Sequence, residues 1–293
     1  MTDAPTRPPV ASDASRAWQA VLEHVEAQLV AGTLTPGDRL PGERALSAEL
    51  GVGRSSVREA LRVLEVLGLI RTHAGSGPNA GAIIISTPGG GMSALMRLQV
   101  AARGFPVADI VRTRLILETS VAGDLAGAVH AARAAQAAYA EQAAYAEQAA
   151  AAEHAPPGLA SAERLLDAMD SPDLEPAEFL ALDAAFHLAL AEASGNQVIT
   201  ATMAGLRSGI EGYALAGLAT ISDWAETSAR LRREHRGIID AIRAADAATA
   251  RARIHDHISG YYAETFIPGG ARLATDTVDP SPTPHASGVT WRR

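Results

Sequence analysis

GVGRSSVREALRVLEVLGLIRTHAGSGPNAGAIII, residues 51–85, is the stretch that decides the fold of the first part of the chain. It opens on a tight Gly-Val-Gly turn. Apolar residues then recur at every third or fourth position, which predicts a helix over 55–67. Gly68 ends this helix. Two short apolar runs, at 69–72 and 82–85, flank a glycine-rich loop and predict a β-hairpin.

Two further helices are predicted upstream, over 15–31 and 42–50, because apolar residues recur there at helical spacing on either side of a turn-rich link. Three helices followed by a hairpin are typical of a winged helix-turn-helix, whose recognition helix enters the major groove of DNA. We therefore expect residues 15–87 to form a DNA-binding domain of three helices plus a β-hairpin wing. The polar, Pro-containing ends at 1–14 and 268–293 are expected to be a disordered arm and a disordered tail.

The rest of the chain is mainly α in its pattern. Residues 88–105 are predicted to form a linker and a connecting helix, and residues 106–267 an all-α helical bundle that makes a second domain. The hexapeptide AAYAEQ occurs twice in tandem, at 137–142 and 143–148, within a low-complexity enlargement over 131–160. The helices are expected at about 93–101, 107–154, 159–169, 176–193, 196–217, 222–244 and 247–266.

Composition excludes several classes of protein. The 293 residues are enough for about two domains, and 47% of them are apolar, so a sizeable core can form. The absence of cysteine excludes disulfide frameworks, cysteine-ligated zinc fingers and a cysteine nucleophile. No apolar run approaches the ~20 residues that span a bilayer, and no signal-peptide core is present, so we expect a cytoplasmic protein with no membrane partner. The net charge of −8 argues against a structural protein that coats DNA without sequence preference.

A row of arginines on the third helix is a candidate for reading DNA. Arg54, Arg58 and Arg62 are spaced by four and therefore line one helical face. Arginine suits bidentate contacts with phosphates and base edges. The same row, interleaved with Glu59 and Glu65, is also typical of a solvated helix face. The turn, the helix and the wing occurring together favour DNA reading.

Small and polar residues surround this row. Ser55 and Ser56 offer hydroxyls at a helix N-terminus, where phosphate oxygens bind well, and Ser56 also fits a capping box with the Glu three positions later. Arg44 begins the preceding helix. Gly75 and Gly77 make a loop tip small enough to enter a minor groove.

The second half of the chain contains one carboxylate and three imidazoles that can form a metal site. Asp183 and His187 lie four positions apart on one predicted helix and so face the same way, while His235 and His257 lie on two later helices. Such a set suits Zn²⁺, Ni²⁺ or Mn²⁺. Hydrogen-bonded histidines in a core, or a polar pair at the surface, would give the same spacing.

Two segments of the first half resemble the signature of the GntR family of bacterial transcription regulators. They are LTPGDRLPGERAL at 34–46 and GVGRSSVREAL at 51–61, within a match over about 16–86. The resemblance implies a winged helix-turn-helix that binds double-stranded operator DNA. The operator contacts that it implies are Arg44, Arg54, Ser55, Ser56 and Arg58, together with the wing at Gly75 and Gly77.

Three later segments, 183–196, 234–242 and 247–257, are similar to the FCD ligand-binding domain of the FadR-type subgroup of that family. The similarity extends over about 107–266. It implies a divalent metal ion inside a helical bundle, held by Asp183, His187, His235 and His257.

The stretch RLILE, with Arg114 and Glu118, is similar to the first-helix motif of these domains. Arg114 can clamp a ligand carboxylate, or it can pair with Glu118 four positions on. Asn196 is a second residue expected to line the effector site. The resemblance implies that the effector is a small organic acid, a sugar acid or an amino acid.

We therefore expect a homodimeric regulator rather than an enzyme, acting as a repressor whose affinity for a palindromic operator changes when a small carboxylate binds. One alternative is a regulator that responds to metal alone, which DNA affinity measured with metal and no acid would reveal. Another is a metallohydrolase fused to a DNA-binding domain, with Glu192 or Glu234 as its base. Metal-dependent turnover would support it, but neither a hydrolase motif nor a well-placed general base is evident.

Overall fold

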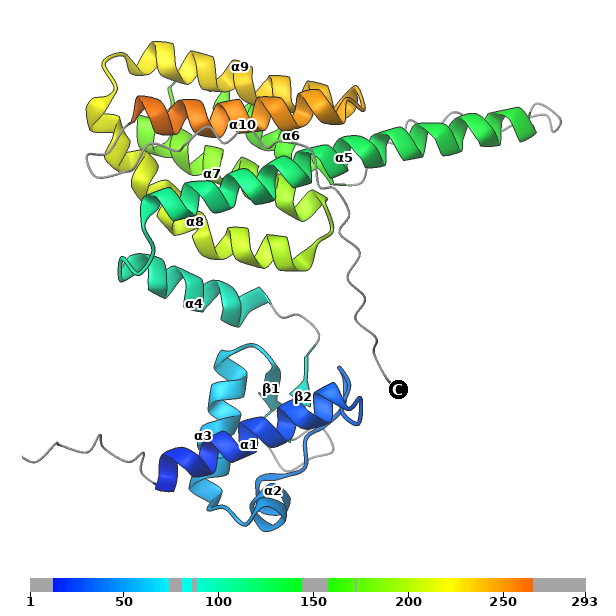
Figure 1. The fold of residues 1–293 in the computed structure, drawn as a ribbon, viewed down its shortest axis with the longest axis vertical. Coiled ribbons are helices and arrows are strands. Elements are labelled where there is room, and N and C mark those ends of the chain that lie inside the picture. Colours follow the sequence, from blue (N-terminus) through cyan, green and yellow to red (C-terminus); the bar gives the residue numbers. More distant parts are fainter. Residues whose placement is uncertain (1–12, 74–80, 86–88, 144–157, 172, 266–293) are drawn as a thin grey trace, which may run out of the picture.

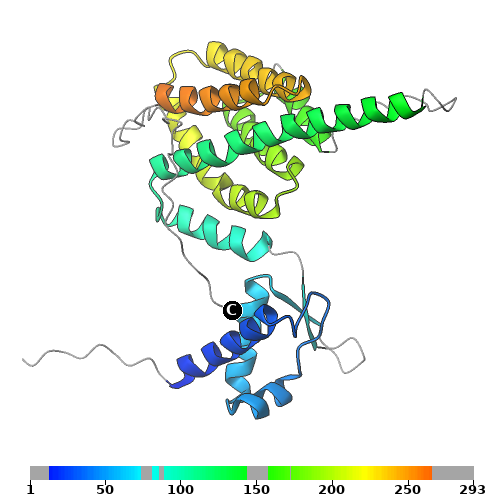
Figure 2. The same cartoon turned by 45° about the vertical axis from the view of Figure 1, so that its right-hand side comes forward.

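The structure, a computed structural model, describes residues 13–73, 81–85, 89–143, 158–171 and 173–265. Two views show a small N-terminal body and a larger helical bundle, with α4 (Gly89–Ala101) lying between them (Figures 1 and 2). Within the described part of the chain, no helix is long and apolar enough to cross a membrane.

The N-terminal body has the three helices and the hairpin that the sequence predicts, and the winged helix-turn-helix is confirmed. The helix starts differ from the prediction by one or two residues: α1 begins at Asp13, inside the arm expected over 1–14, α2 begins at Glu43, and the third helix begins one residue early. The helix begins at Arg54 after Gly53, no side chain caps it, and the capping box predicted for Ser56 is wrong because Ser56 already lies inside the first turn. The elements are α1 (Asp13–Val30), α2 (Glu43–Leu50), α3 (Arg54–Val66), β1 (Ile70–His73) and β2 (Gly81–Ile84).

The turn between α2 and α3 fixes the direction of α3. Gly51 has a φ of 65°, a left-handed conformation in which a side chain would be strained. The Ser47 hydroxyl donates to the Val52 carbonyl oxygen at 2.6 Å and closes the turn. Val57 and Leu64 on one face of α3 are buried against α1, so the opposite face of α3 points to solvent.

The wing has a partner that the sequence did not predict. β1 pairs antiparallel with β2, and the link before α2, expected only to turn, pairs with the other edge of β2 through Arg39 and Ile83. Asp38 arranges this segment, because its carboxylate accepts hydrogen bonds from the backbone N–H and the hydroxyl of Thr35. The loop tip with Gly75 and Gly77 lies outside the described residues.

The bundle contains the helices predicted for the second half, plus a short 3₁₀ turn, Leu218–Thr220. α5 extends well beyond the other helices (Figure 1), and the side chains of residues 131–138 are exposed. The predicted continuation of this helix to residue 154 falls on residues 144–157, which the structure does not describe. The helices are α5 (Val107–Ala143), α6 (Leu159–Met169), α7 (Pro176–Ala193), α8 (Gln197–Gly217), α9 (Trp224–Arg243) and α10 (Ala247–Glu264).

α4 is held tightly at both ends. A Cβ atom added at Gly205 of α8 would lie 2.5 Å from the Cβ of Met96, and one added at Gly209 would lie 2.7 Å from a methyl carbon of Val100. At the start of α4, a Cβ atom on Gly91 would lie 2.1 Å from the carbonyl oxygen of Leu67, the residue that caps the end of α3. α4 therefore packs against the end of α3 at its first turn and against the glycines of α8 farther along.

Candidate functional site

Four side chains from three helices meet inside the bundle. Asp183 and His187 come from α7, His235 from α9 and His257 from α10, and their ligand atoms all lie within 4.8 Å of one another. The three histidine residues are at most 3% exposed, since each sits on the apolar face of its helix. Phe186 packs against the rings of His187 and His235 and closes one side of the cluster.

The distances between these atoms suit a metal ion. The Nε2 atom of His257 lies 3.1 Å from those of both His187 and His235, and the Nε2 atom of His235 lies 2.9 Å from Asp183 Oδ1. Ligands bound to one ion at ~2.0–2.2 Å are separated by about these distances.

The partners of the outer ring nitrogens decide which ring nitrogens are free to bind a cation at the centre. Nδ1 of His187 contacts the Glu118 carboxylate, and Nδ1 of His257 lies 2.9 Å from Glu234 Oε2. A carboxylate accepts hydrogen bonds, so in the neutral rings the proton is on Nδ1 and the lone pair is on Nε2. The Nε2 lone pairs of His187 and His257 then face each other at 3.1 Å, which is repulsive without a cation between them. The residues present therefore fit a divalent metal ion with carboxylate-supported histidine ligands.

The surrounding charges keep both buried carboxylates ionised, so Asp183 can bind a cation and Glu118 can accept a hydrogen bond from His187. Burial would raise the pKa of Glu118, but the nearby charges of Arg114 and His187 outweigh it and lower that pKa to about 2. Burial likewise opposes ionisation of Asp183, yet its hydrogen bond with His235 and the histidine charges hold its pKa well below the usual range. Burial and the neighbouring His235 lower the pKa of His257 to about 4, which favours the neutral ring that a metal needs.

Replacing Glu118 by Gln tests the supporting role of this carboxylate. We expect the affinity for Zn²⁺ to fall roughly 10- to 100-fold, as is typical when the partner of a ligand histidine is lost. Competition with a chromophoric chelator measures this affinity. Glu192→Gln, which changes an exposed carboxylate on α7, is the control and should bind Zn²⁺ as the wild type does. Equal affinities for the two variants would contradict the role given to Glu118.

A small cavity lies beside the cluster and contains Arg114. Arg114 is only 4% exposed. Two of its nitrogens donate hydrogen bonds, Nε to Glu118 at 2.7 Å and Nη1 to the Tyr213 hydroxyl. Its third nitrogen, Nη2, is buried without a hydrogen-bond partner. Arg114 thus forms the ion pair with Glu118 and also faces the cavity. The pairing with Glu118 and a contact with a ligand carboxylate, the two roles that the sequence left open, are therefore compatible. The cavity is lined by Arg114, Leu180, Asp183, Ile210, Tyr213, Ala214, His257, Ile258 and Tyr261.

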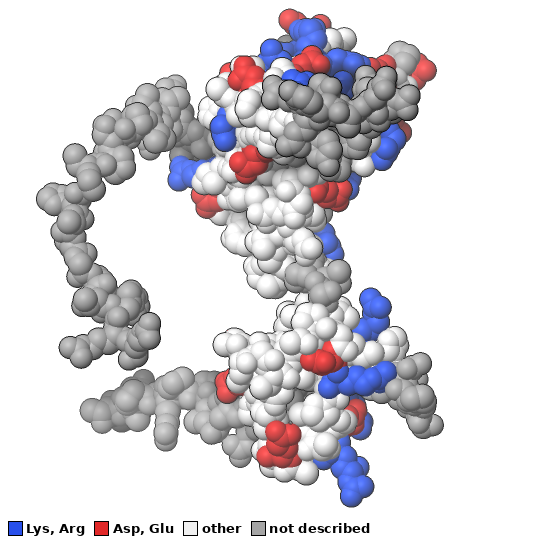
Figure 3. Space-filling model, turned by 90° about the vertical axis from the view of Figure 1, so that its right-hand side faces the viewer, with Lys and Arg blue, Asp and Glu red and all other residues white. Residues whose placement is uncertain are grey.

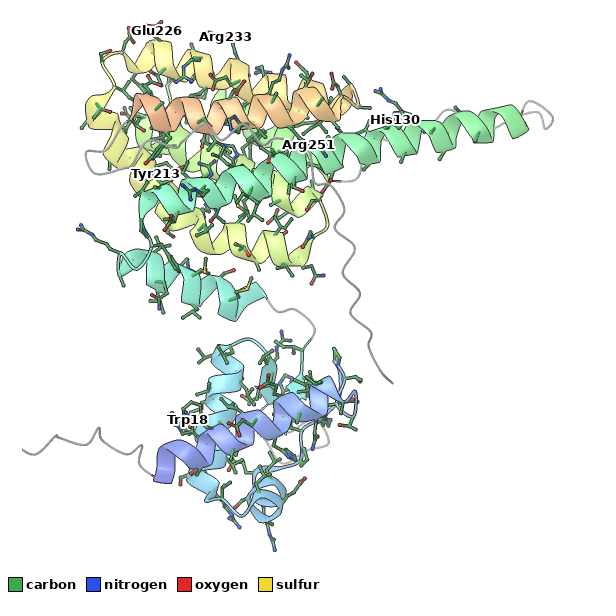
Figure 4. All side chains as sticks on the ribbon, viewed as in Figure 1. Trp18, His130, Tyr213, Glu226, Arg233 and Arg251 are labelled. Atoms are coloured by element: carbon green, nitrogen blue, oxygen red, sulfur yellow. The ribbon has the colours of Figure 1, made fainter. Side chains whose placement is uncertain are left out.

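Two tyrosines of this lining were missed by the sequence reasoning. Tyr213 lies on α8, where this helix packs beside the first part of α5 (Figure 4), and Tyr261 lies on α10. The Tyr261 hydroxyl donates to the Ala214 carbonyl oxygen at 3.0 Å, which links α10 to α8 at the cavity wall. The chain has only five tyrosines. The position of Tyr213 and Tyr261 on apolar helix faces was the sequence signal that could have identified them as lining residues.

Other candidates lie elsewhere. Asn196, expected at the effector site, is exposed and caps α8 by accepting hydrogen bonds from the backbone N–H groups of Val198 and Ile199. It does not line the cavity, because a residue that begins a helix in a loop is held by the helix end. Glu192, a candidate base, is exposed. Glu234 is engaged by His257 and, at 2.7 Å, by Arg230.

The DNA-reading candidates lie on the N-terminal body. Arg44, Arg54, Ser55 and Arg58 are exposed and Ser56 is half-buried, on α2 and the first turns of α3. Arg58 Nη2 lies 3.2 Å from Glu43 Oε2, so this arginine is already paired across the two helices. Figure 3 shows arginines projecting from this body, below a waist that is mostly uncharged. The arrangement presents an uncapped helix N-terminus and exposed guanidinium groups to a ligand with phosphates.

Comparison with known proteins shows the family of the chain. The model of the bacterial regulatory proteins of the gntR family matches residues 18–78, and that of the FCD domain matches residues 141–260. The chain is 31% identical over 240 residues to the "Putative L-lactate dehydrogenase operon regulatory protein" of Escherichia coli strain K12, with 82% of each chain covered. It is 28% identical over 251 residues to the HTH-type transcriptional regulator LutR of Bacillus subtilis strain 168, covering 80% of this chain and 97% of that protein.

A solved structure has the same fold. Streptococcus agalactiae GntR superposes with a TM-score of 0.51 at 23% identity, over 83% of this chain and 96% of that one. The matched families and relatives are transcription regulators, so the chain is a regulator and not an enzyme. The chain belongs to the GntR family of bacterial transcription regulators, in its FadR-type subgroup, and carries an FCD domain in its helical half.

Proposed function

We propose that the protein is a cytoplasmic repressor that binds a palindromic operator as a homodimer and responds to a small carboxylate bound beside a divalent metal ion. Zn²⁺, Ni²⁺ and Mn²⁺ are the candidate ions. The observation that carries the effector proposal is the unpartnered Nη2 of Arg114, buried in a cavity that also contains the metal-site residues Asp183 and His257. A buried guanidinium nitrogen without an acceptor is costly, and an anionic ligand removes that cost.

Each group around the cavity has a distinct part in binding. The metal ion, when present, supplies positive charge and open coordination positions for an oxygen ligand. Arg114 donates from Nη2 to a carboxylate oxygen. Glu118 holds the guanidinium in place through its 2.7 Å hydrogen bond to Nε, so this donor is positioned before the ligand arrives. The name of the Escherichia coli relative, which concerns an L-lactate dehydrogenase operon, agrees with a small hydroxy acid as effector.

The fold also supplies a route from the cavity to the DNA. α8 lines the cavity with Ile210 and Tyr213, and its Gly205 and Gly209 hold α4. Gly91 of α4 in turn contacts the end of α3. A ligand that moves α8 therefore shifts α4 and the DNA-reading helix. Because this is a coupling between two sites, operator DNA must change the affinity for the acid by the same factor.

Replacing Gly205 by Ala tests this route. The added Cβ would lie 2.5 Å from Met96 Cβ, so α4 has to move away from α8. In coupled sites, one ligand typically changes the affinity for the other by about 5- to 150-fold. We expect the factor by which the acid changes operator affinity to be at least about threefold smaller in this variant than in the wild type, while the metal content stays stoichiometric. Fluorescence anisotropy with labelled operator measures it. Gly212→Ala, on the same helix but with open space around its Cα, should respond as the wild type does.

The proposed function as a whole is tested by gel shifts with DNA from the protein's own upstream region, with no addition, with metal alone, and with metal plus each candidate acid. Release of the DNA by metal plus an acid, but not by metal alone, is the expected outcome. Release by metal alone would instead favour a metal-responsive regulator. Tighter binding with acid would make the protein an activator or co-repressed regulator. No response to any acid at saturating concentration would refute the sensor.

A further inference from the structure

α4 carries apolar side chains on two opposite sides. One side packs on α8, where the Ser93 hydroxyl donates to the Ala201 carbonyl oxygen at 2.9 Å and Met96 lies against Gly205. Within the part of the chain that the structure describes, the side of α4 away from α8 stays exposed. A helix that is apolar all round is normally buried all round. The uncovered side of α4 therefore needs another surface to pack against.

This uncovered side is a stripe of large apolar residues spaced by three, which places them together on the helix. Leu98 is 68% exposed and Leu95 is 53% exposed. The stripe continues onto the end of α3, because Gly91 packs on the backbone of Leu67, and both Leu67 and Val66 are exposed. Contiguous exposed apolar surface of this kind marks an interaction site. We call it the waist face, and it consists of Val66, Leu67, Met92, Leu95 and Leu98.

The charge of the waist face fits a second copy of the same chain. At the axis of a two-fold dimer, a surface meets the same surface of the partner. Side chains of one charge would repel their own copies there, whereas apolar side chains can pack together. None of the five residues of the waist face is charged, and the waist between the two bodies is mostly uncharged in the view of Figure 3.

The position of the waist face also fits a second copy. A dimer on an inverted repeat holds its two recognition helices about 34–36 Å apart, or a multiple of that distance. The waist face lies on α4 and at the end of α3, between the DNA-reading residues and the bundle. A contact there acts directly on the spacing of the two DNA-reading helices. A contact between the bundles alone would act on that spacing only through α4.

We propose that the waist face is a surface on which two copies of the chain meet, with α4 of one protomer crossing α4 of its partner. The apolar stripes of the two copies pack against each other, and the ends of the two α3 helices lie beside them. This contact sets the spacing of the DNA-reading helices. It rests on the proposed function in one respect, which is that the regulator is a homodimer.

Cross-linking tests the contact, and the chain is well suited to it because it contains no cysteine. Leu95→Cys and Leu98→Cys each place one thiol in the stripe of the full-length protein. We expect diamide to join most chains of at least one of these variants into a disulfide-linked dimer on a non-reducing gel. Glu226→Cys, an exposed position on α9 away from α4 (Figure 4), is the control and should stay a single chain. No dimer with either leucine variant, or as much dimer with the control, would overturn the proposal.

A charge placed in the stripe gives an independent measurement. In Leu98→Glu, a carboxylate would be buried against the second copy without a partner, which is strongly unfavourable. We expect the Kd of the dimer, measured by sedimentation, to rise at least tenfold, while the metal content and the affinity for a single half-site stay as in the wild type. Val30→Glu, which changes an 84% exposed residue on α1 outside the waist face, should leave the dimer intact. An unchanged Kd in Leu98→Glu would count against the contact.

Failure of this inference differs from failure of the homodimer itself. A wild type that is a dimer, with no cross-link at either leucine and an intact dimer in Leu98→Glu, would show that the copies meet elsewhere. That result would overturn the waist contact and leave the homodimer standing. A wild type that stays monomeric at every concentration, with and without palindromic DNA, would overturn both.

Discussion

Purified with His257 replaced by Ala, the protein will contain less than a tenth of the metal that the wild type holds. His257 is central to the cluster, because its Nε2 atom lies 3.1 Å from those of both His187 and His235. Its loss also leaves Glu234 without its histidine partner. We expect the affinity for Zn²⁺ to fall more than about 100-fold, beyond the 10- to 100-fold typical of losing only a supporting residue. Metal analysis and chelator competition measure both quantities.

A matched control lies two residues away. His255 is exposed, points away from the cluster and pairs with Asp256 at 3.2 Å, so His255→Ala should keep a full complement of metal. Thermal unfolding adds a second readout, since a metal at 1,000 times its Kd stabilises a folded protein by about 4 kcal/mol. Zn²⁺ should raise the Tm of the wild type and of His255→Ala, and not that of His257→Ala. Full metal content in His257→Ala would refute the metal site.

Replacing His187 and replacing His235 should lower the metal content to different extents. His187 has a carboxylate at its outer nitrogen, whereas Nδ1 of His235 is buried without a hydrogen-bond partner. A ligand histidine with an acceptor is better oriented and more basic. We therefore expect His235→Ala to retain more metal than His187→Ala, as the same metal analysis will show.

Replacing Arg54 by Ala will weaken operator binding by roughly 5- to 150-fold, equivalent to the ~1–3 kcal/mol of one good base contact. Arg54 is the first residue of α3, is exposed, and stands beside the uncapped helix N-terminus. Arg58→Ala should weaken operator binding less than Arg54→Ala does, because Arg58 has to break its ion pair with Glu43, 3.2 Å away, before it can contact DNA. Anisotropy titrations at two salt concentrations separate a base contact from a phosphate contact.

The control for this experiment is Arg112→Ala, which removes an exposed arginine from α5, far along the chain from the DNA-reading helix. It should bind operator as the wild type does, and Arg54→Ala should keep its metal. If Arg54→Ala and Arg112→Ala bound DNA equally well, α3 would not be the reading helix. His257→Ala and Arg54→Ala are thus opposite cases, since each is expected to lose one function and keep the other.

Local sequence was enough to predict the elements of this fold. The Gly-Val-Gly turn at 51–53 predicts the step between α2 and α3, because the left-handed Gly51 requires a residue without a Cβ. Apolar periodicity predicts the bundle helices to within a few residues over the described part of the chain. The spacing of Asp183 and His187 places both on one face of α7 by helix geometry alone. These features depend on neighbours within about one helical turn.

The tertiary structure decided how these elements serve the site. Glu118 and Glu234 lie against two histidines of the cluster, Tyr213 and Tyr261 line the cavity, and Asn196 caps α8. All of these placements depend on which helix faces meet. The packing of α4 against Gly205, Gly209 and Leu67, which joins α8 to the end of α3, depends on the same meeting of faces. Helical spacing fixes which side of a helix a residue occupies, but not the partner across the core. That partner is set by close packing among residues distant in sequence, many of them apolar groups without a distinctive local pattern.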